Sequence, residues 1–153
     1  MCSSDLRTSA VEILEQTSGR LTHFVAGLGT TGTFVGTSRR LKEHDASIQT
    51  IAVQPEDSFH GLEGLKHLPT AIVPGIWDSR VADEVWDAPT EAAYDIARAV
   101  ARTEGLLVGH SSGAALWAVR RLAGTIREGV VVTVFPDSGD RYLSTGLYGA
   151  KRR

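Results

Sequence analysis

The chain has 153 residues, of which 42% are hydrophobic and 22% are charged, and its formal net charge is -2. These values are typical of one soluble globular domain with a core of its own, and they argue against nucleic acid as a principal partner. No apolar run is long enough to span a bilayer, so we expect no membrane association and a cytoplasmic protein. The one cysteine, Cys2, excludes an internal disulfide and a cysteine-based metal cage. Neither His60 nor His110 stands at metal-ligand spacing, so we predict no metal site.

Helical periodicity and short apolar runs alternate along the chain. Helices are predicted over residues 7–17, 32–44, 90–105 and the last part of 106–124. Strands are predicted over residues 22–27, 48–55, 81–87, the first part of 106–124 and the first part of 129–140. The last strand is too apolar to face solvent. Short apolar strands separated by helices indicate an α/β fold, a parallel sheet with helices on both faces.

Ligands of such sheets bind at the carboxyl ends of the strands. Three loops follow predicted strands and carry polar groups: GLGTTGT (27–33), GHSSGAA (109–115) and PDSGDRYLS (136–144). Residues 54–80 form a long irregular excursion, and an irregular segment of that length in a compact domain is more often functional than idle. We expect a ligand site among the three loops and a functional role for the excursion.

The stretch GLGTTGT connects a strand to a helix. Such a turn directs several backbone N–H groups at one point, and the helix dipole adds partial positive charge there, which suits a phosphate. Threonine hydroxyls supply further donors. No Lys-Ser/Thr pair follows the last glycine, and Gln54 and Pro55 stand where a dinucleotide-binding fold carries an acidic residue. We therefore expect a single phosphate monoester, with a purely structural turn as the alternative.

Three motifs occur in order: THFVAGLGTTGTFVGTSRRLKE, EGLLVGHSSGAAL and PDSGDRYLSTG. Together they resemble the C-terminal part of the cysteine synthase family, which are pyridoxal-phosphate enzymes of the tryptophan-synthase-β-like fold. The Thr-Thr pair and the stretch LPTAIVPGIWD are most similar to the B-type cysteine synthases. The resemblance covers residues 7 to about 149. It implies pyridoxal 5'-phosphate as the cofactor and the large-domain part of that fold.

The resemblance also implies roles for individual residues. The cofactor phosphate is expected to contact Gly29, Thr30, Thr31, Gly32 and Thr33. Ser111 matches the family residue that hydrogen-bonds the pyridine nitrogen; without the family it is read as an N-cap of the following helix. Gly64 and Lys66 match substrate-side positions, with a solvated loop as the alternative. Asp137, Ser138 and Asp140 are expected to shape the pocket wall, and Arg141 and Tyr142 to pack and pair structurally.

No catalytic residue is predicted in this chain. Its three lysines, Lys42, Lys66 and Lys151, do not stand in the family's lysine motif, which holds the cofactor as a Schiff base and belongs to the N-terminal half. We expect residues 1–6 to be a non-native leader and residues 7–150 to form a C-terminal pyridoxal-phosphate-binding domain. The isolated chain is therefore expected to be inactive. A genuine N-terminus at Met1 is the alternative.

The resemblance implies that the parent protein is a transferase of cysteine biosynthesis and a homodimer. It would replace the β-substituent of O-acetylserine, or of O-phosphoserine, with sulfide or a related sulfur donor to give cysteine. Two alternatives stay open: a cystathionine β-synthase-like enzyme, and a non-catalytic module that binds phosphate or a partner. A serine hydrolase is poorly supported, because no histidine follows Ser111 in the sequence.

Overall fold

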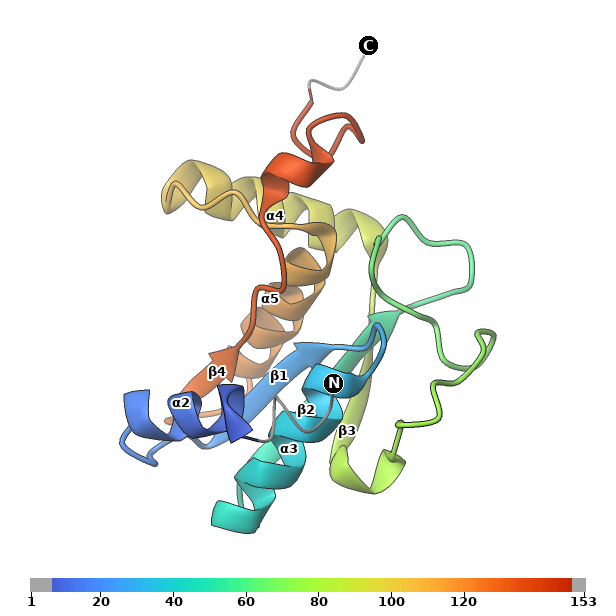
Figure 1. Ribbon diagram of the computed structural model, residues 1–153. Coiled ribbons are helices and arrows are strands. Elements are labelled where there is room, and N and C mark those ends of the chain that lie inside the picture. The colour runs from blue at the N-terminus through green and yellow to red at the C-terminus, as the bar shows by residue number, and fades with distance from the viewer. Residues whose placement is uncertain (1–6, 150–153) are drawn as a thin grey trace.

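The computed structural model describes residues 7–149. One parallel sheet has the strand order β3-β2-β1-β4 (Figure 1). Its strands are β1 (His23–Gly27), β2 (Gln49–Pro55), β3 (Glu84–Ala88) and β4 (Val131–Thr133). The helices are α2 (Ser9–Gln16), α3 (Gly32–His44), α4 (Thr90–Thr103) and α5 (His110–Ala123), with short 3-10 turns η1 (Ser79–Val81) and η2 (Gly139–Tyr142). No helix within residues 7–149 is both long and apolar enough to cross a membrane.

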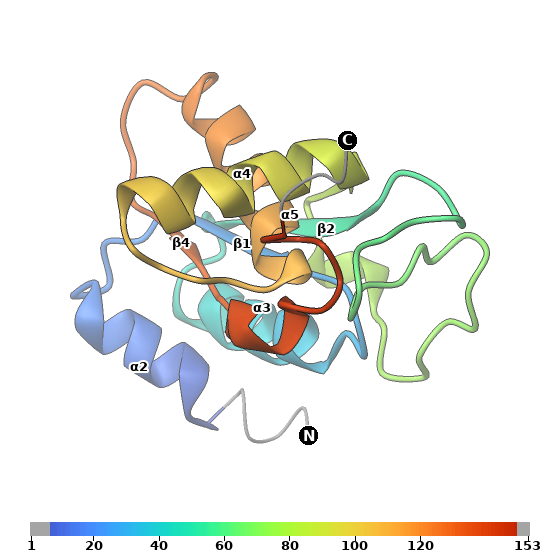
Figure 2. The same cartoon turned by 90° about the horizontal axis from the view of Figure 1, so that it is seen from above.

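Strand β1 explains why helices cover both faces of the sheet, because successive side chains of a strand point to opposite faces. Phe24 and Ala26 pack in one core cluster with Phe34 of α3. Val25 packs in the other cluster with Ala118 of α5. Figure 2 shows α2 and α3 on one side of the strands and α4 and α5 on the other. The predicted α/β fold with a doubly covered parallel sheet is confirmed.

The strand order creates a crevice at one end of the sheet. Strand β1 lies between β2 and β4, and the chain runs from β1 through β2 to β3 before it returns on the other side of β1 as β4. The segments that follow β1 and β4 therefore leave the sheet in opposite directions. In open parallel sheets, ligands bind outside the carboxyl ends of the strands at such a switch point.

Two strand predictions are corrected by the structure. The first part of residues 106–124 is not a strand; Val108 makes only an isolated antiparallel bridge to Ser138. Gly105 turns the chain with φ +70°, and the next two leucines stay about half exposed, so this run does not enter the sheet. The strand in residues 129–140 is limited to β4, which pairs only with β1 among the described strands and is half buried. It forms a sheet edge, and Phe135 beyond it is 40% exposed.

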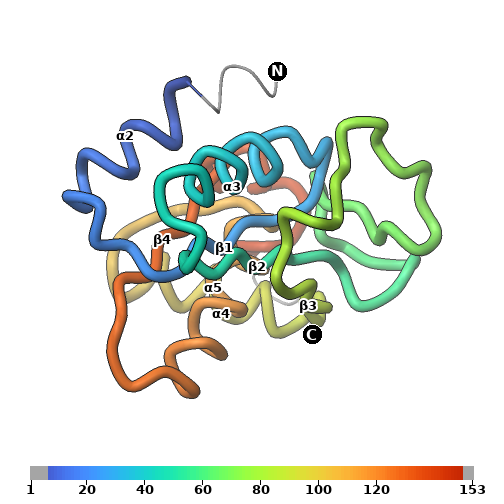
Figure 3. Tube along the Cα trace, turned by 90° about the horizontal axis from the view of Figure 1, so that it is seen from below, coloured from blue at the N-terminus to red at the C-terminus, as the bar shows by residue number. Residues whose placement is uncertain are grey.

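The excursion between β2 and β3 folds back over the carboxyl end of the sheet in its first half. Leu62 is fully buried, and the Lys66 N–H donates a hydrogen bond of 2.8 Å to the Leu28 carbonyl. The Tyr94 hydroxyl of α4 donates to the Gly61 carbonyl at 2.6 Å. The second half, around Ile72, is exposed. Figure 3 shows the excursion projecting to one side of the strands.

Candidate functional site

A pocket of about 300 Å³ lies in the crevice at the carboxyl ends of β1 and β4. Its lining comes from four segments that are far apart in the sequence: residues 26–33, 64–65, 111 and 134–141. The volume is at the lower end of the range for small-molecule sites in proteins. The loop after β1, the excursion, the start of α5 and the segment after β4 thus meet at one place, and three of these are the loops in which the sequence predicts a ligand site.

The loop after β1 is held from both sides. The Leu28 N–H donates to the Val53 carbonyl at 2.8 Å, and the Leu28 carbonyl accepts from Lys66, so this residue adds backbone pairing beyond the strand. A Cβ atom built on Gly29 would stand less than 3.0 Å from the Gly64 carbonyl oxygen. Only glycine therefore lets the excursion lie against this loop.

Thr31 is the most informative residue of the loop. It is the N-cap residue of α3 and has φ +65°, a left-handed conformation that is uncommon outside glycine. Its side chain is 2% exposed and lines the pocket, and its Oγ1 has no hydrogen-bond partner among the described residues. A buried hydroxyl normally has a partner. An anion at the N-terminus of α3 would supply one, because the first turn of α3 contains no acidic residue.

Ser111 lines the opposite side of the pocket. Helix α5 begins at His110 with Gly109 as the N-cap, so Ser111 is the second helical residue. The N-cap interpretation of Ser111 is therefore wrong, and its hydroxyl makes no hydrogen bond within the described structure. The adjacent Ser112 is fully buried and does not line the pocket. Two neighbouring serines thus have different surroundings.

Asp137 forms the wall beside α5. The Tyr142 hydroxyl donates a hydrogen bond to Oδ2, and the Gly109 N–H donates to the Asp137 carbonyl at 3.3 Å. A Cβ atom on Gly109 would collide with Oδ1, so the carboxylate lies directly against the backbone where α5 starts. Burial and this carboxylate raise the pKa of Tyr142 to about 12. The N-terminus of α5 therefore already has an anion beside it, unlike that of α3.

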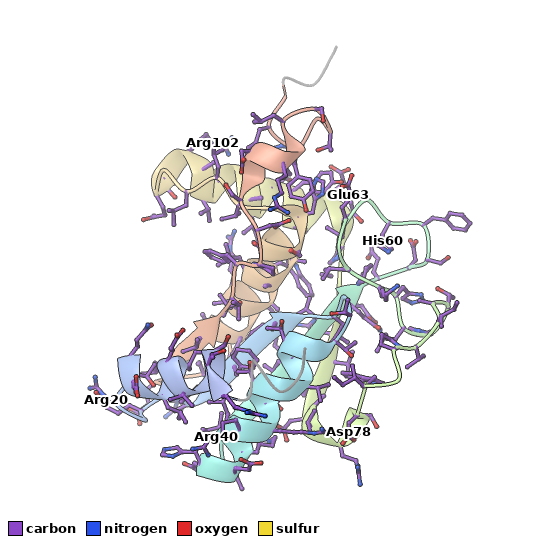
Figure 4. All side chains as sticks on the ribbon, viewed as in Figure 1. Arg20, Arg40, His60, Glu63, Asp78 and Arg102 are labelled. Carbon is purple, nitrogen blue, oxygen red and sulfur yellow. The ribbon has the colours of Figure 1, made fainter. Side chains whose placement is uncertain are left out.

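The remaining predicted site residues fall in different places. Gly64 lies at the pocket with φ +88°, whereas the Lys66 side chain is not part of the lining. The Lys42 ammonium group donates hydrogen bonds to the Ile48 carbonyl and to Asp83, at the amino ends of β2 and β3. Lys151 lies outside the described residues. Within residues 7–149 no lysine lines the pocket. Figure 4 shows His60 and Glu63 on the excursion near the carboxyl end of the sheet, and Asp78 near the opposite end.

The comparisons with known proteins agree with this arrangement. Residues 3–137 match the family model described as "Pyridoxal-phosphate dependent enzyme", and the chain belongs to this family. The curated relatives it matches include cysteine synthases and, at 39% identity over 152 residues, an O-acetylserine dependent cystathionine beta-synthase of Bacillus subtilis, covering 95% of this chain and 50% of the relative. It is 51% identical over 148 residues to a cysteine synthase of Aquifex aeolicus, covering 94% of this chain and 45% of the relative. It is 41% identical over 142 residues to cysteine synthase B of Escherichia coli, covering 93% and 46%.

A solved structure gives the same result for the fold. The crystal structure of a cysteine synthase from Entamoeba histolytica superposes with a TM-score of 0.86 at 36% identity, covering 95% of this chain and 45% of that one. The resemblance to cysteine synthases is thereby confirmed. The chain spans about half the length of the curated relatives it matches.

Proposed function

We propose that this chain carries the phosphate- and ring-binding side of a pyridoxal 5'-phosphate site in a cysteine synthase. The observation that supports this most strongly is the buried, unpartnered hydroxyl of Thr31 at the N-terminus of α3, a residue that lines the same pocket as Ser111. The cofactor combines a phosphate monoester with an aromatic nitrogen, and the pocket offers donors for both.

The charges at the starts of α3 and α5 support one orientation of the cofactor; Arg141 of η2 also lines the pocket. At the start of α3 the donors are backbone N–H groups and threonine hydroxyls, with no acidic side chain in the first turn. At the start of α5, the Asp137 carboxylate would repel a phosphate. The phosphate therefore belongs with Gly29, Thr30, Thr31, Gly32 and Thr33, and the ring nitrogen with Ser111. Gly32 shapes this turn from the first position of α3 and does not itself line the pocket.

Ser111 would determine how the ring is used. When bound, pyridoxal phosphate supplies an electron sink for carbanion chemistry on an amino acid. A serine hydroxyl donates a hydrogen bond to the ring nitrogen but does not protonate it as a carboxylic acid would, which leaves a weaker sink. Loss of the β-substituent is then favoured over transamination. This supports β-replacement on O-acetylserine, or on O-phosphoserine, with sulfide or a related donor.

Several properties of the whole protein follow as proposals. Gly64 is proposed as a substrate-side position because it lines the pocket beside Gly29. Lys66 is proposed as a second substrate-side residue, whose side chain must move to reach the pocket. Residues 7–150 are proposed as the cofactor-binding domain of a homodimeric cytoplasmic enzyme. The proposed leader, residues 1–6, lies outside the described residues. Since no described lysine lines the pocket, we expect this chain to bind the cofactor non-covalently and to turn over no O-acetylserine.

The test is a titration with pyridoxal 5'-phosphate, followed by absorbance and fluorescence, with pyridoxal as the phosphate-free control. The phosphate compound is expected to bind at least about tenfold more tightly, because charge-assisted hydrogen bonds are the strong ones. Ser111→Ala is expected to weaken binding about fivefold, the effect of one lost hydrogen bond of about 1 kcal/mol. The matched control, Ser112→Ala, changes a side chain outside the pocket and should leave affinity within about twofold.

Equal affinity for pyridoxal and its phosphate would contradict the proposal, and so would equal affinity of the wild type and Ser111→Ala. Borohydride reduction followed by mass spectrometry tests the non-covalent prediction. A stoichiometric adduct on any lysine would show that prediction to be wrong.

A further inference from the structure

His110 is a buried titratable residue to which the proposed function assigns no role. Its side chain is 1% exposed and lies between two tyrosine rings. The Tyr94 ring of α4 stacks on it with a centroid separation of 4.9 Å and an interplanar angle of 24°. The Tyr142 ring of η2 lies on it at 4.3 Å and 48°. These three residues, here called the aromatic stack, come from three separate elements.

Each tyrosine of the aromatic stack holds a different wall of the pocket. The Tyr94 hydroxyl donates to the Gly61 carbonyl at 2.6 Å, three residues before Gly64 in the excursion. The Tyr142 hydroxyl donates to Asp137 in the wall beside α5. His110 joins the two tyrosines and directly precedes Ser111 in the first turn of α5. Its position therefore sets the relation between the two walls and the serine between them.

The ring nitrogens of His110 are poorly satisfied. Nδ1 is buried without a hydrogen-bond partner in the described structure, and Nε2 lies 3.5 Å from the Thr145 hydroxyl. What holds the ring is thus packing between flat surfaces rather than hydrogen bonding. A ring fixed in this way positions the backbone around it only as long as it stays uncharged, because a second N–H would be buried without an acceptor.

We infer that His110 is a positioning residue for the cofactor site: the aromatic stack fixes Ser111 and the two pocket walls in the arrangement that binds pyridoxal phosphate. This inference rests on the proposed function. Burial lowers the pKa of His110 below its usual value, against the smaller effects of Glu63 and Asp137, which raise it. The charged groups around the stack are Glu63 of the excursion, Glu91 and Arg98 of α4, Asp137 after β4 and Arg141 of η2, and the two tyrosine hydroxyls of the stack also titrate.

The sign of the pH effect follows from these facts. Because the pKa of His110 is lowered in the folded arrangement, the neutral ring is the form that fits. As pH falls through that lowered pKa, protonation disrupts the aromatic stack and cofactor affinity declines. The phosphate of the cofactor also titrates, with a second pKa of about 6. A variant that lacks only the histidine nitrogens separates the two contributions.

The experiment uses the whole chain and titrates it with pyridoxal 5'-phosphate from about pH 5 to about pH 8. His110→Ala, which removes the ring, is expected to weaken binding at neutral pH about tenfold. His110→Phe keeps a flat ring between the tyrosines and should restore affinity to within about threefold of the wild type. Its affinity should also fall less on acidification, because only the phosphate titration remains. Circular dichroism and thermal unfolding confirm that each variant is folded.

Two further variants are used if His110→Ala does not fold. Tyr142→Phe and Tyr94→Phe keep the aromatic stack and remove one hydrogen bond each, and each is expected to weaken binding about threefold to fivefold. A wild type that binds no pyridoxal phosphate overturns the proposed function itself. A wild type that binds, together with His110→Ala or both tyrosine variants at wild-type affinity, overturns the positioning role alone. The positioning role is also overturned if the affinities of the wild type and His110→Phe for pyridoxal phosphate change in parallel with pH.

Discussion

Replacing Gly29 with alanine is expected to weaken pyridoxal phosphate binding severely and to destabilise the fold. The new Cβ would stand less than 3.0 Å from the Gly64 carbonyl oxygen, a separation that real Cβ atoms essentially never show. The obstacle is a backbone atom, so no side chain can rotate away. Either the loop after β1 or the excursion must shift. Overpacking of this kind costs about 1–3 kcal/mol of unfolding free energy.

The effect on binding exceeds the effect on stability, because the loop is also the proposed phosphate site. Displacing its backbone N–H groups and Thr31 removes more than one hydrogen bond to an anion. We expect an affinity loss of at least about 100-fold, corresponding to about 3 kcal/mol. The measurements are a pyridoxal phosphate titration and urea unfolding of the same preparation.

Gly75→Ala is the matched control for this change. Gly75 lies in the excursion, as Gly64 does, but a Cβ atom there meets nothing within 4 Å. Its alanine variant should keep both affinity and stability close to the wild type, within about 0.5 kcal/mol. A Gly29→Ala protein that unfolds at the wild-type urea concentration and binds the cofactor within about threefold would contradict the prediction.

The second large effect is expected at Gly113, inside α5. A glycine in a helix interior usually costs up to about 1 kcal/mol relative to alanine, so alanine normally stabilises. At Gly113 we expect alanine to lower the stability instead. A Cβ on Gly113 would collide with the Ala93 carbonyl oxygen of α4 and stand 3.2 Å from the Ala97 Cβ. Both alanines are fully buried where the two helices cross, so relief requires α4 to move.

We expect Gly113→Ala to lower the free energy of unfolding by about 2–3 kcal/mol, which for a chain of this size is roughly 5–10 °C in Tm. Thermal and urea unfolding measure it. Gly124→Ala is the control, because Gly124 ends the same helix at φ -77° and a Cβ there comes no closer than 3.4 Å to the Arg121 carbonyl. A Gly113→Ala protein as stable as the wild type would show that the helices separate without cost.

Several features could be predicted because their signals are local. The turn at residues 27–33 was recognisable from its glycines and threonines between a strand and a helix, and the structure places Gly29, Thr30, Thr31 and Thr33 in the pocket lining. The end of α4 was equally local: Gly105 follows the helix with φ +70°. A glycine after a helix is a recurrent stop signal.

Other features had no local signal. The aromatic stack joins Tyr94, His110 and Tyr142, which stand 16 and 32 residues apart along the chain, and no periodicity relates them. The apolar residues 106–108 are predicted as a strand, but they do not enter the sheet. Apolar composition does not reveal whether a neighbouring strand is available for pairing. Whether Ser111 caps α5 depends on where that helix begins, and the conformation of Gly109 decides it.

By itself, the sequence determined the fold class, the helices and the glycine- and threonine-rich turn at residues 27–33, because helical period, strand composition and turn glycines act between residues close together along the backbone. Only the tertiary structure decided which loops meet. Strand order brought β1 beside β4, and this placed Ser111, Gly64 and Asp137 around one pocket. The physical reason is that a pocket depends on which surfaces pack against one another, and packing joins residues that no local interaction connects.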